Sequence, residues 1–292
     1  MVVLQVIIEG LATGTVYAGL ALALVLVYRM TGVVNFAQGE MGMFGAFVIW
    51  WLSQNGLSNY TAMAIGLACS FFLGMAVERV VIRPIVRFGE LPVAITTVGI
   101  FLLFNELAPW IWGTENRAFP GLFVRGVYSV DGLIVGLDIL GTMAIMTIVA
   151  AAFLLMLRAT KLGLAMRGAA ANPISSGLVG IPVQHVIMLG WGLANVLATL
   201  AGALIAPRLM LDSNLMLGVI VYALAAAAVG GFQSIFGAIF GGLFIGVVEN
   251  LAANFVGFIS SDLKIIVPLA FLVLILVFRP TGLFGRPQDR MV

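Results

Sequence analysis

The chain has 292 residues, of which 62% are hydrophobic and 9% charged, and its 14 basic and 12 acidic residues leave a net charge of +2. This composition excludes an ordinary soluble domain, because most of the side chains need a solvent as apolar as the core of a bilayer. The charge imbalance is too small to indicate a nucleic-acid partner. The sequence therefore predicts an all-α, polytopic integral membrane protein in contact with membrane lipid.

The apolar stretches predict the number of helices. Each stretch is close to the roughly 20 residues with which a helix crosses a bilayer. Five come first, at residues 6–28, 34–52, 62–82, 92–112 and 139–157, and three regions follow a basic interruption, at residues 186–207, 215–256 and 265–278. The region 215–256 can hold two short segments, broken near Gly230 and Gly231. We expect about eight to nine transmembrane or re-entrant helices in a single domain that spans residues 1–292.

The basic residues predict the orientation in the membrane, because cytoplasmic loops are enriched in lysine and arginine. The segment 113–138, between the fourth and fifth spans, carries three acidic residues against two basic ones and should lie outside. We expect an external N-terminus and a cytoplasmic C-terminus, which favours nine crossings. The basic groups expected on the cytoplasmic side are Arg79, Arg83 and Arg87; Arg158, Lys161 and Arg167; and Arg279, Arg286 and Arg290.

The residue types exclude several kinds of chemistry. The sequence has no G-x-x-x-x-G-K-[ST] motif and no Ser/His/Asp or Cys/His set on one side of the membrane, so we expect no enzyme activity and no cofactor in this chain. Cys69 is expected to pack as a small hydrophobic residue, and His185 to be a polar residue at the membrane interface rather than a metal ligand. Active transport would therefore need an ion gradient or a separate ATPase. The scarcity of buried charge argues against ion coupling.

A basic interruption at residues 158–183 separates the fifth and sixth spans. Its second half predicts a short helix, with Asn172 as the N-cap, Pro173 in the first turn and Gly180 at the end. A short helix at the cytoplasmic surface is what a permease needs to receive force from a separate motor protein. The alternative is an ordinary loop that only fixes the topology.

Polar residues and glycines fall inside the second span, in the sequence VVNFAQGEMGMFGAF. At about 100° per residue, a helix places Asn35, Gln38, Gly39 and Gly42 on one stripe and Glu40 on nearly the opposite face. The stripe indicates either a lining of a translocation pathway or a close contact with a partner helix. Packing mediated by glycine, with the polar residues at the interface, is the alternative.

Other polar positions in the spans are weaker signals. A carboxylate at the depth of Glu40 needs a partner or water, and Arg29 and the polar loops are the candidates. Asn195 in the sixth span is a further pathway candidate, although structural hydrogen bonding is favoured for it and for Asn105 and Glu106. The glycine-rich run at residues 230–250 faintly echoes the second span, as in transporters with internal pseudo-symmetry.

Four ordered motifs carry a resemblance to a known family. They are VVNFAQGEMGMFGAF, RGAAANPISSGLVGIP, AAAAVGGFQSIFGAIFGGLFIGVVEN and FRPTGLFGRP. Together they resemble the permease subunits of bacterial branched-chain amino acid ABC importers, over essentially the whole chain. The likeness is greatest to the shorter of the two permeases in such systems.

The resemblance implies a function and a set of partners. It implies a binding-protein-dependent importer in the bacterial inner membrane, which moves branched-chain amino acids or a related small polar or carboxylate solute inward by alternating access. The implied partners are a paralogous permease, two cytoplasmic ATPase subunits that hold ATP and Mg, and an extracytoplasmic solute-binding protein. An ion-coupled secondary transporter and a passive small-solute channel remain alternatives. The ATPase-coupling residues that the resemblance implies are Arg167, Asn172, Pro173, Gly177, Gly180 and Ile181.

Overall fold

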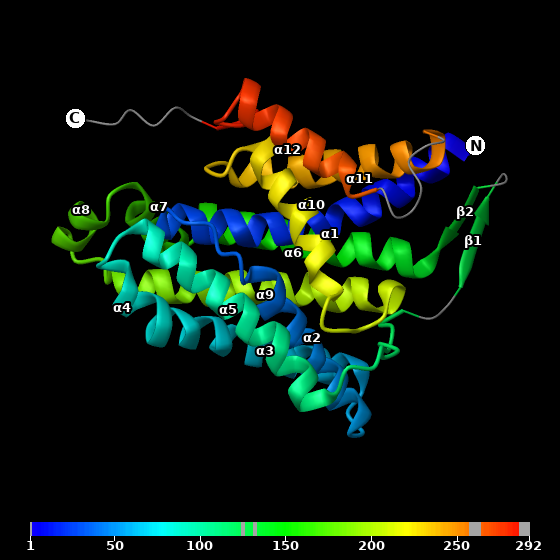
Figure 1. The fold of residues 1–292 in the computed structure, drawn as a ribbon, viewed down its shortest axis with the longest axis horizontal. Coiled ribbons are helices and arrows are strands. Elements are labelled where there is room, and N and C mark those ends of the chain that lie inside the picture. Colours follow the sequence, from blue (N-terminus) through cyan, green and yellow to red (C-terminus); the bar gives the residue numbers. More distant parts are fainter. Residues whose placement is uncertain (1, 124–125, 131–132, 257–263, 286–292) are drawn as a thin grey trace.

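A long bundle of apolar helices makes up the molecule (Figure 1). The computed structural model describes residues 2–123, 126–130, 133–256 and 264–285. Within these ranges, six helical segments are long and apolar enough to cross a membrane, and α2, α10 and α12 are shorter. The predicted all-α polytopic class is confirmed. The nine helices are α1 (Val2–Thr31), α2 (Gln38–Gln54), α3 (Asn59–Val77), α5 (Glu90–Trp112), α6 (Leu137–Ala159), α9 (Val183–Leu209), α10 (Leu215–Gly230), α11 (Ile235–Phe255) and α12 (Ile266–Phe278).

Helices α1 and α9 form the centre of the bundle. In their most apolar windows of 18 residues, 89% of α1 and 78% of α9 is buried, against 17% for α6. The outer helices expose large apolar side chains such as Phe72 on α3, Leu102 on α5 and Ile148 on α6. Such surfaces are stable only against lipid or a partner protein, which agrees with a membrane protein.

Glycine allows α1 to pack closely against α11, its most extensive partner. A Cβ added at Gly14 would lie 2.9 Å from the carbonyl oxygen of Gly242, and one at Gly10 would lie 2.8 Å from the Cα of Val247. The two backbones therefore approach closely enough for dispersion contacts without side chains between them. This is the way in which helices associate in a bilayer, where burial of apolar surface gives little driving force.

The structure corrects three details of the predicted elements. As expected, the helical structure is interrupted near Gly230 and Gly231: α10 ends at Gly230, and Gly231 has a φ of +95°. However, α11 is a full-length helix of 21 residues rather than a short segment. A two-stranded antiparallel hairpin, β1 (Val127–Val130) and β2 (Leu133–Gly136), was not expected. Its sequence signal is an Asp-Gly pair between VYSV and LIVG, which is the pattern of a tight hairpin turn.

The third correction concerns Cys69, which lies on α3 with its side chain exposed rather than packed in the core. Helical side chains repeat every 3.6 residues, so an apolar run by itself does not say which face meets the core. His185 lies in the first turn of α9 and is exposed, as expected for an interfacial residue.

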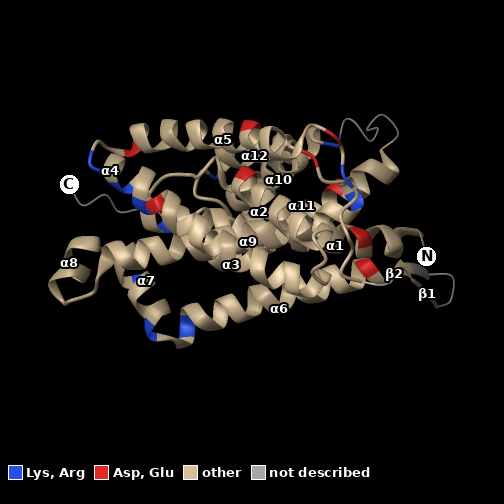
Figure 2. Cartoon of the chain, turned by 90° about the horizontal axis from the view of Figure 1, so that it is seen from below, with Lys and Arg blue, Asp and Glu red and all other residues tan. Residues whose placement is uncertain are grey.

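The two ends of the bundle differ in charge (Figure 2). Many of the basic residues gather at the end that carries α4 (Arg83–Val86) and α7 (Lys161–Ala171), while several acidic residues lie at the end of the N-terminus and the hairpin. Figure 1 places the start of α1 and the end of α12 at opposite ends of the bundle. This arrangement agrees with an odd number of crossings.

Candidate functional site

The basic interruption folds as two helices that project from one end of the bundle (Figure 1). The second of them, α8 (Pro173–Leu178), is the short helix that the sequence predicts, and α7, which precedes it, was not expected. Thr160 caps α7, since its hydroxyl oxygen accepts a hydrogen bond from the amide of Gly163 at 3.1 Å. The segment 158–183 is therefore ordered by its own local hydrogen bonds.

The predicted start and end signals of α8 are confirmed. The side-chain oxygen of Asn172 accepts a hydrogen bond from the amide of Ser175 at 2.9 Å, and Pro173 occupies the first turn. Beyond the helix, Gly180 has a φ of +87°, a left-handed conformation that residues with a Cβ rarely adopt. The chain then turns back at Ile181, whose amide donates to the carbonyl oxygen of Ser176 at 3.0 Å.

Apolar side chains cover the tip of α8. Ile174, Leu178 and Val179 are 79%, 84% and 78% exposed. They lie at the basic end of the bundle, together with the exposed Arg167 of α7. Three adjacent exposed apolar residues on a capped helix are typical of a surface that another protein covers.

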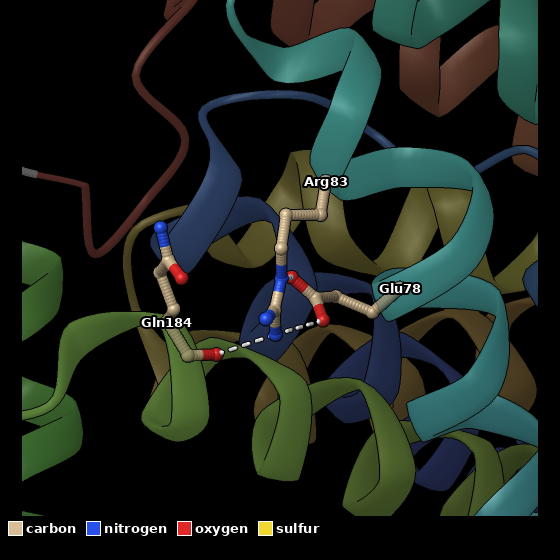
Figure 3. Close-up of polar contacts among 3 residues, drawn as sticks. All are labelled: Glu78, Arg83 and Gln184. Atoms are coloured by element: carbon tan, nitrogen blue, oxygen red, sulfur yellow. Dashed lines mark hydrogen bonds and ion pairs between the residues drawn. The ribbon is translucent and has the colours of Figure 1, made fainter.

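An ion pair with a buried carboxylate attaches the end of this segment to the bundle (Figure 3). Glu78 belongs to a π-helical turn, Glu78–Ile82, that continues α3, and its side chain is 4% exposed. Arg83 donates two hydrogen bonds to this carboxylate, at 3.2 and 2.8 Å, and a third to the backbone oxygen of Gln184 in α9 at 3.1 Å. The guanidinium of Arg83 therefore ties the end of α3 to the first turn of α9, directly after the segment 158–183. We call these three residues the Arg83 clamp.

The structure places the polar residues of the second span at the entry to α2, and it corrects the predicted stripe. The helix begins at Gln38, so Asn35 lies in the turn before it rather than on the helix. Asn35 donates to the side-chain oxygen of Gln38 at 2.9 Å and accepts from the amide of Ala37 at 3.1 Å. Both side chains are 1% exposed.

The two faces of α2 contact different helices. A Cβ at Gly42 would lie 2.7 Å from the carbonyl oxygen of Ala198 in α9, and Gly39 packs on Ile220 in α10. On another face, the buried carboxylate of Glu40 accepts a hydrogen bond from Asn105 in α5 at 3.4 Å. The candidate partners named from the sequence, Arg29 and the loops, are therefore replaced by an amide from a neighbouring helix.

Asn195 joins two helices. Its side-chain amide donates to the carbonyl oxygen of Ser70 in α3 at 2.8 Å, and the residue is fully buried. In the described part of the chain, no hydrogen bond joins Asn195 to the polar residues at the start of α2. Its hydrogen bond holds α3 against α9.

A cavity with several polar residues on its wall, at the end of the bundle that holds the N-terminus, was not predicted from the sequence. It has a volume of about 480 Å³ and lies between α1, α9, α10, α11 and the start of α12. On its wall, the hydroxyl of Tyr17 donates to the carboxylate of Glu249 at 2.9 Å, and the rings of Tyr17 and Tyr222 stack with centroids 4.7 Å apart. The only signal in the sequence was an acidic residue inside an apolar span, which marks functional positions in membrane proteins.

The bundle, its projecting capped helix and its polar cavity define a membrane permease. The sequence agrees, because residues 6–276 match the family described as branched-chain amino acid transport system / permease component. The chain belongs to this family.

Individual relatives match over almost the whole chain. BraD of Pseudomonas aeruginosa, a high-affinity branched-chain amino acid transport system permease protein, is 29% identical and the match covers 99% of this chain and 98% of BraD. LivH of Salmonella typhimurium, with the same description, is 30% identical, with 99% and 97% covered. A chain of PsaBC from Streptococcus pneumoniae shares the fold at 13% identity, with a TM-score of 0.51 and 94% and 91% covered. The chain is therefore a multi-pass permease subunit of an ABC importer, and its family is a transport component rather than an enzyme.

Proposed function

We propose that this permease carries branched-chain amino acids, or a related small polar or carboxylate solute, into the cell. The relatives named for branched-chain amino acid transport support the solute class. The proposed complex contains a second, paralogous permease, two cytoplasmic ATPase subunits that bind ATP and Mg, and an external binding protein. Residues 1–292 form one permease domain in the bacterial inner membrane, with the N-terminus outside and the segment 158–183 and the C-terminus in the cytoplasm.

The projecting helix α8 is the observation that carries the proposed coupling to an ATPase. Its cap and its left-handed glycine fix its conformation before any partner binds, and its apolar tip lacks a covering surface among the described residues. A preformed helix loses little conformational entropy on docking. We assign the contact with the ATPase to this segment, with Arg167, Asn172, Pro173, Gly177, Gly180 and Ile181 as the coupling residues.

The entry to α2 is the second element of the proposal. Asn35, Gln38 and Glu40 are buried and polar, and Gly39 and Gly42 allow close approach of α9 and α10. We propose that this group, with Asn195, supports the pathway or the interface between the two permeases. Alternating access would then change the packing of α2 against its neighbours.

Co-purification followed by transport tests the proposal. The tagged chain is isolated with its partners in mild detergent, reconstituted in liposomes with the binding protein, and assayed for uptake of labelled leucine with and without ATP. We expect a second permease and two ATPase subunits in the complex, and uptake that requires ATP. A chain that purifies alone and transports leucine without nucleotide would overturn the proposal and favour an ion-coupled transporter or a channel.

A matched pair of variants tests the role of α8 in this assay. Leu178→Asp charges the exposed tip, and Val127→Asp charges an exposed residue of β1 at the opposite end. We expect Leu178→Asp to abolish binding of the ATPase subunits while the permease still inserts, and Val127→Asp to retain them. Normal ATPase recovery with Leu178→Asp would remove α8 from the interface.

A further inference from the structure

The charges on the wall of the 480 Å³ cavity are balanced. Two acidic residues, Glu9 and Glu249, and two basic residues, Arg208 and Lys264, line it, together with neutral polar groups. A cavity for an anion would be lined mainly by bases, and one for a cation mainly by acids. Balanced charge on a wall that is otherwise apolar and aromatic suits a small solute that carries one charge of each sign.

Glu249 is the acidic group best placed to meet such a solute. Its carboxylate is 6% exposed and accepts a hydrogen bond from Tyr17. The ion pairs in the described part of the chain are Glu78 with Arg83 and Asp138 with Arg208, so no basic side chain there lies within ion-pair distance of Glu249. Lys264 lines the same cavity but lies beyond ion-pair distance of this carboxylate, so a solute ammonium would be able to approach Glu249 more closely and pair with it directly.

Arg208 supplies the opposite charge from the last turn of α9. Its Nε lies 4.0 Å from the carboxylate of Asp138, at the limit of an ion pair, and its side chain is 33% exposed. The guanidinium therefore keeps donors for another carboxylate, which it can bind through two parallel hydrogen bonds. The same wall carries the stacked aromatic rings of Tyr17 and Tyr222.

We propose that this cavity binds a free α-amino acid or a similar small zwitterion, with Glu249 at the ammonium group and Arg208 at the carboxylate. The volume lies within the range of about 300–1,000 Å³ that is typical of small-molecule sites. The inference rests on the proposed function and deepens it, because it gives the permease its own recognition of the charged ends of the solute. A site of this kind favours amino acids over acids or amines of the same carbon skeleton.

Equilibrium binding to the reconstituted complex without the binding protein tests the site. The probes are L-leucine, α-ketoisocaproate, which has a ketone in place of the ammonium, and isoamylamine, which lacks the carboxylate. We expect leucine to bind at least about ten times more tightly than either analogue, because the loss of one hydrogen bond to a charged group weakens binding by about this factor. This comparison uses the unaltered protein and does not depend on the folding of a variant.

Variants assign the charges to residues. Glu249→Gln should weaken leucine binding about ten-fold and leave α-ketoisocaproate binding unchanged, and Glu249→Asp should retain most of the leucine affinity. Arg208→Gln should weaken leucine and leave isoamylamine unchanged. Glu106→Gln, which removes an exposed carboxylate from α5, is the matched control and should leave all three affinities unchanged.

The outcomes separate this inference from the proposed function. Three results would overturn the zwitterion site. They are no leucine binding, equal affinities for leucine and both analogues, or a leucine affinity of Glu249→Gln within two-fold of the unaltered protein. ATP-driven leucine uptake by the unaltered complex would still stand in that case. Failure of ATP-driven uptake with all partners present would instead overturn the proposed function, whatever the cavity binds.

Discussion

Loss of the Arg83 clamp should both destabilise the permease and uncouple it. Arg83→Met removes the guanidinium and leaves the carboxylate of Glu78, which is 4% exposed, without its ionic partner. Breaking a buried ion pair from one side costs about 3–5 kcal/mol. Because the side chain of Arg83 is 24% exposed, water partly compensates the remaining charge, and we expect about 2–3 kcal/mol. For a chain of this size, such a loss lowers the midpoint of thermal unfolding by roughly 3–5 °C.

The assay combines stability with coupling. The midpoint is measured on the complex in detergent, and the number of ATP molecules hydrolysed per solute imported is measured in liposomes. The variant also loses the hydrogen bond to the backbone oxygen of Gln184, so the end of the segment 158–183 is no longer fixed to α3. We expect hydrolysis to continue while uptake falls several-fold.

Two control variants test the stabilising role of the Arg83 clamp. In the double variant Glu78→Gln/Arg83→Met no unpaired charge remains at the clamp, and at least half of the lost stability should return while coupling stays poor. Arg87→Met removes a nearby guanidinium that lies over the ring of Phe88, 4.7 Å from its centroid, and should cost less than about 1 kcal/mol. If Arg83→Met unfolds at the temperature of the unaltered protein, or if the double variant is no more stable than the single one, the clamp has no stabilising role.

Three further predictions follow from local geometry. Asn172→Ala removes the cap of α8 and should cost about 1 kcal/mol locally, seen as faster amide hydrogen exchange at residues 175–178, whereas Asn172→Asp should retain the protection. Gly14→Ala should destabilise the bundle by about 1–3 kcal/mol, because its Cβ meets α11, while Gly99→Ala, with open space around it, should be neutral or stabilising in thermal unfolding. In a Cys69→Ser background, Ile174→Cys should react with a membrane-impermeant maleimide only from the cytoplasmic face; labelling from outside would reverse the proposed orientation.

The features that the sequence predicted correctly are encoded locally. The apolar spans, the cap at Asn172 and the helix end at Gly180 each depend on residues within a few positions of one another. Such signals act on the local backbone conformation and do not depend on which helices become neighbours in the fold. The break between α10 and α11 at Gly231 belongs to the same class, because only a glycine adopts its positive φ without strain.

The features that were missed depend on contacts between distant residues. Tyr17 and Glu249 are separated by 232 positions, and Asn105 meets Glu40 across 65. No period or motif in one sequence specifies which helices become neighbours. The outward face of Cys69 escaped prediction for the same reason, since a span that is apolar on all sides shows no amphipathic pattern.

Helix α9 connects the two functional ends of the molecule. It begins directly after the segment 158–183, where Arg83 donates a hydrogen bond to the backbone oxygen of Gln184. Its last turn contains Arg208, which lines the cavity. With 27 residues it is about 40 Å long, and α1, α2 and α3 pack along it. If α9 moves as a unit, a shift imposed at its start reaches the cavity without a chain of separate side-chain changes. The proposed solute site and the proposed ATPase contact thus lie beside opposite ends of α9, and a variant that loosens the Arg83 clamp should alter uptake more than equilibrium binding of leucine.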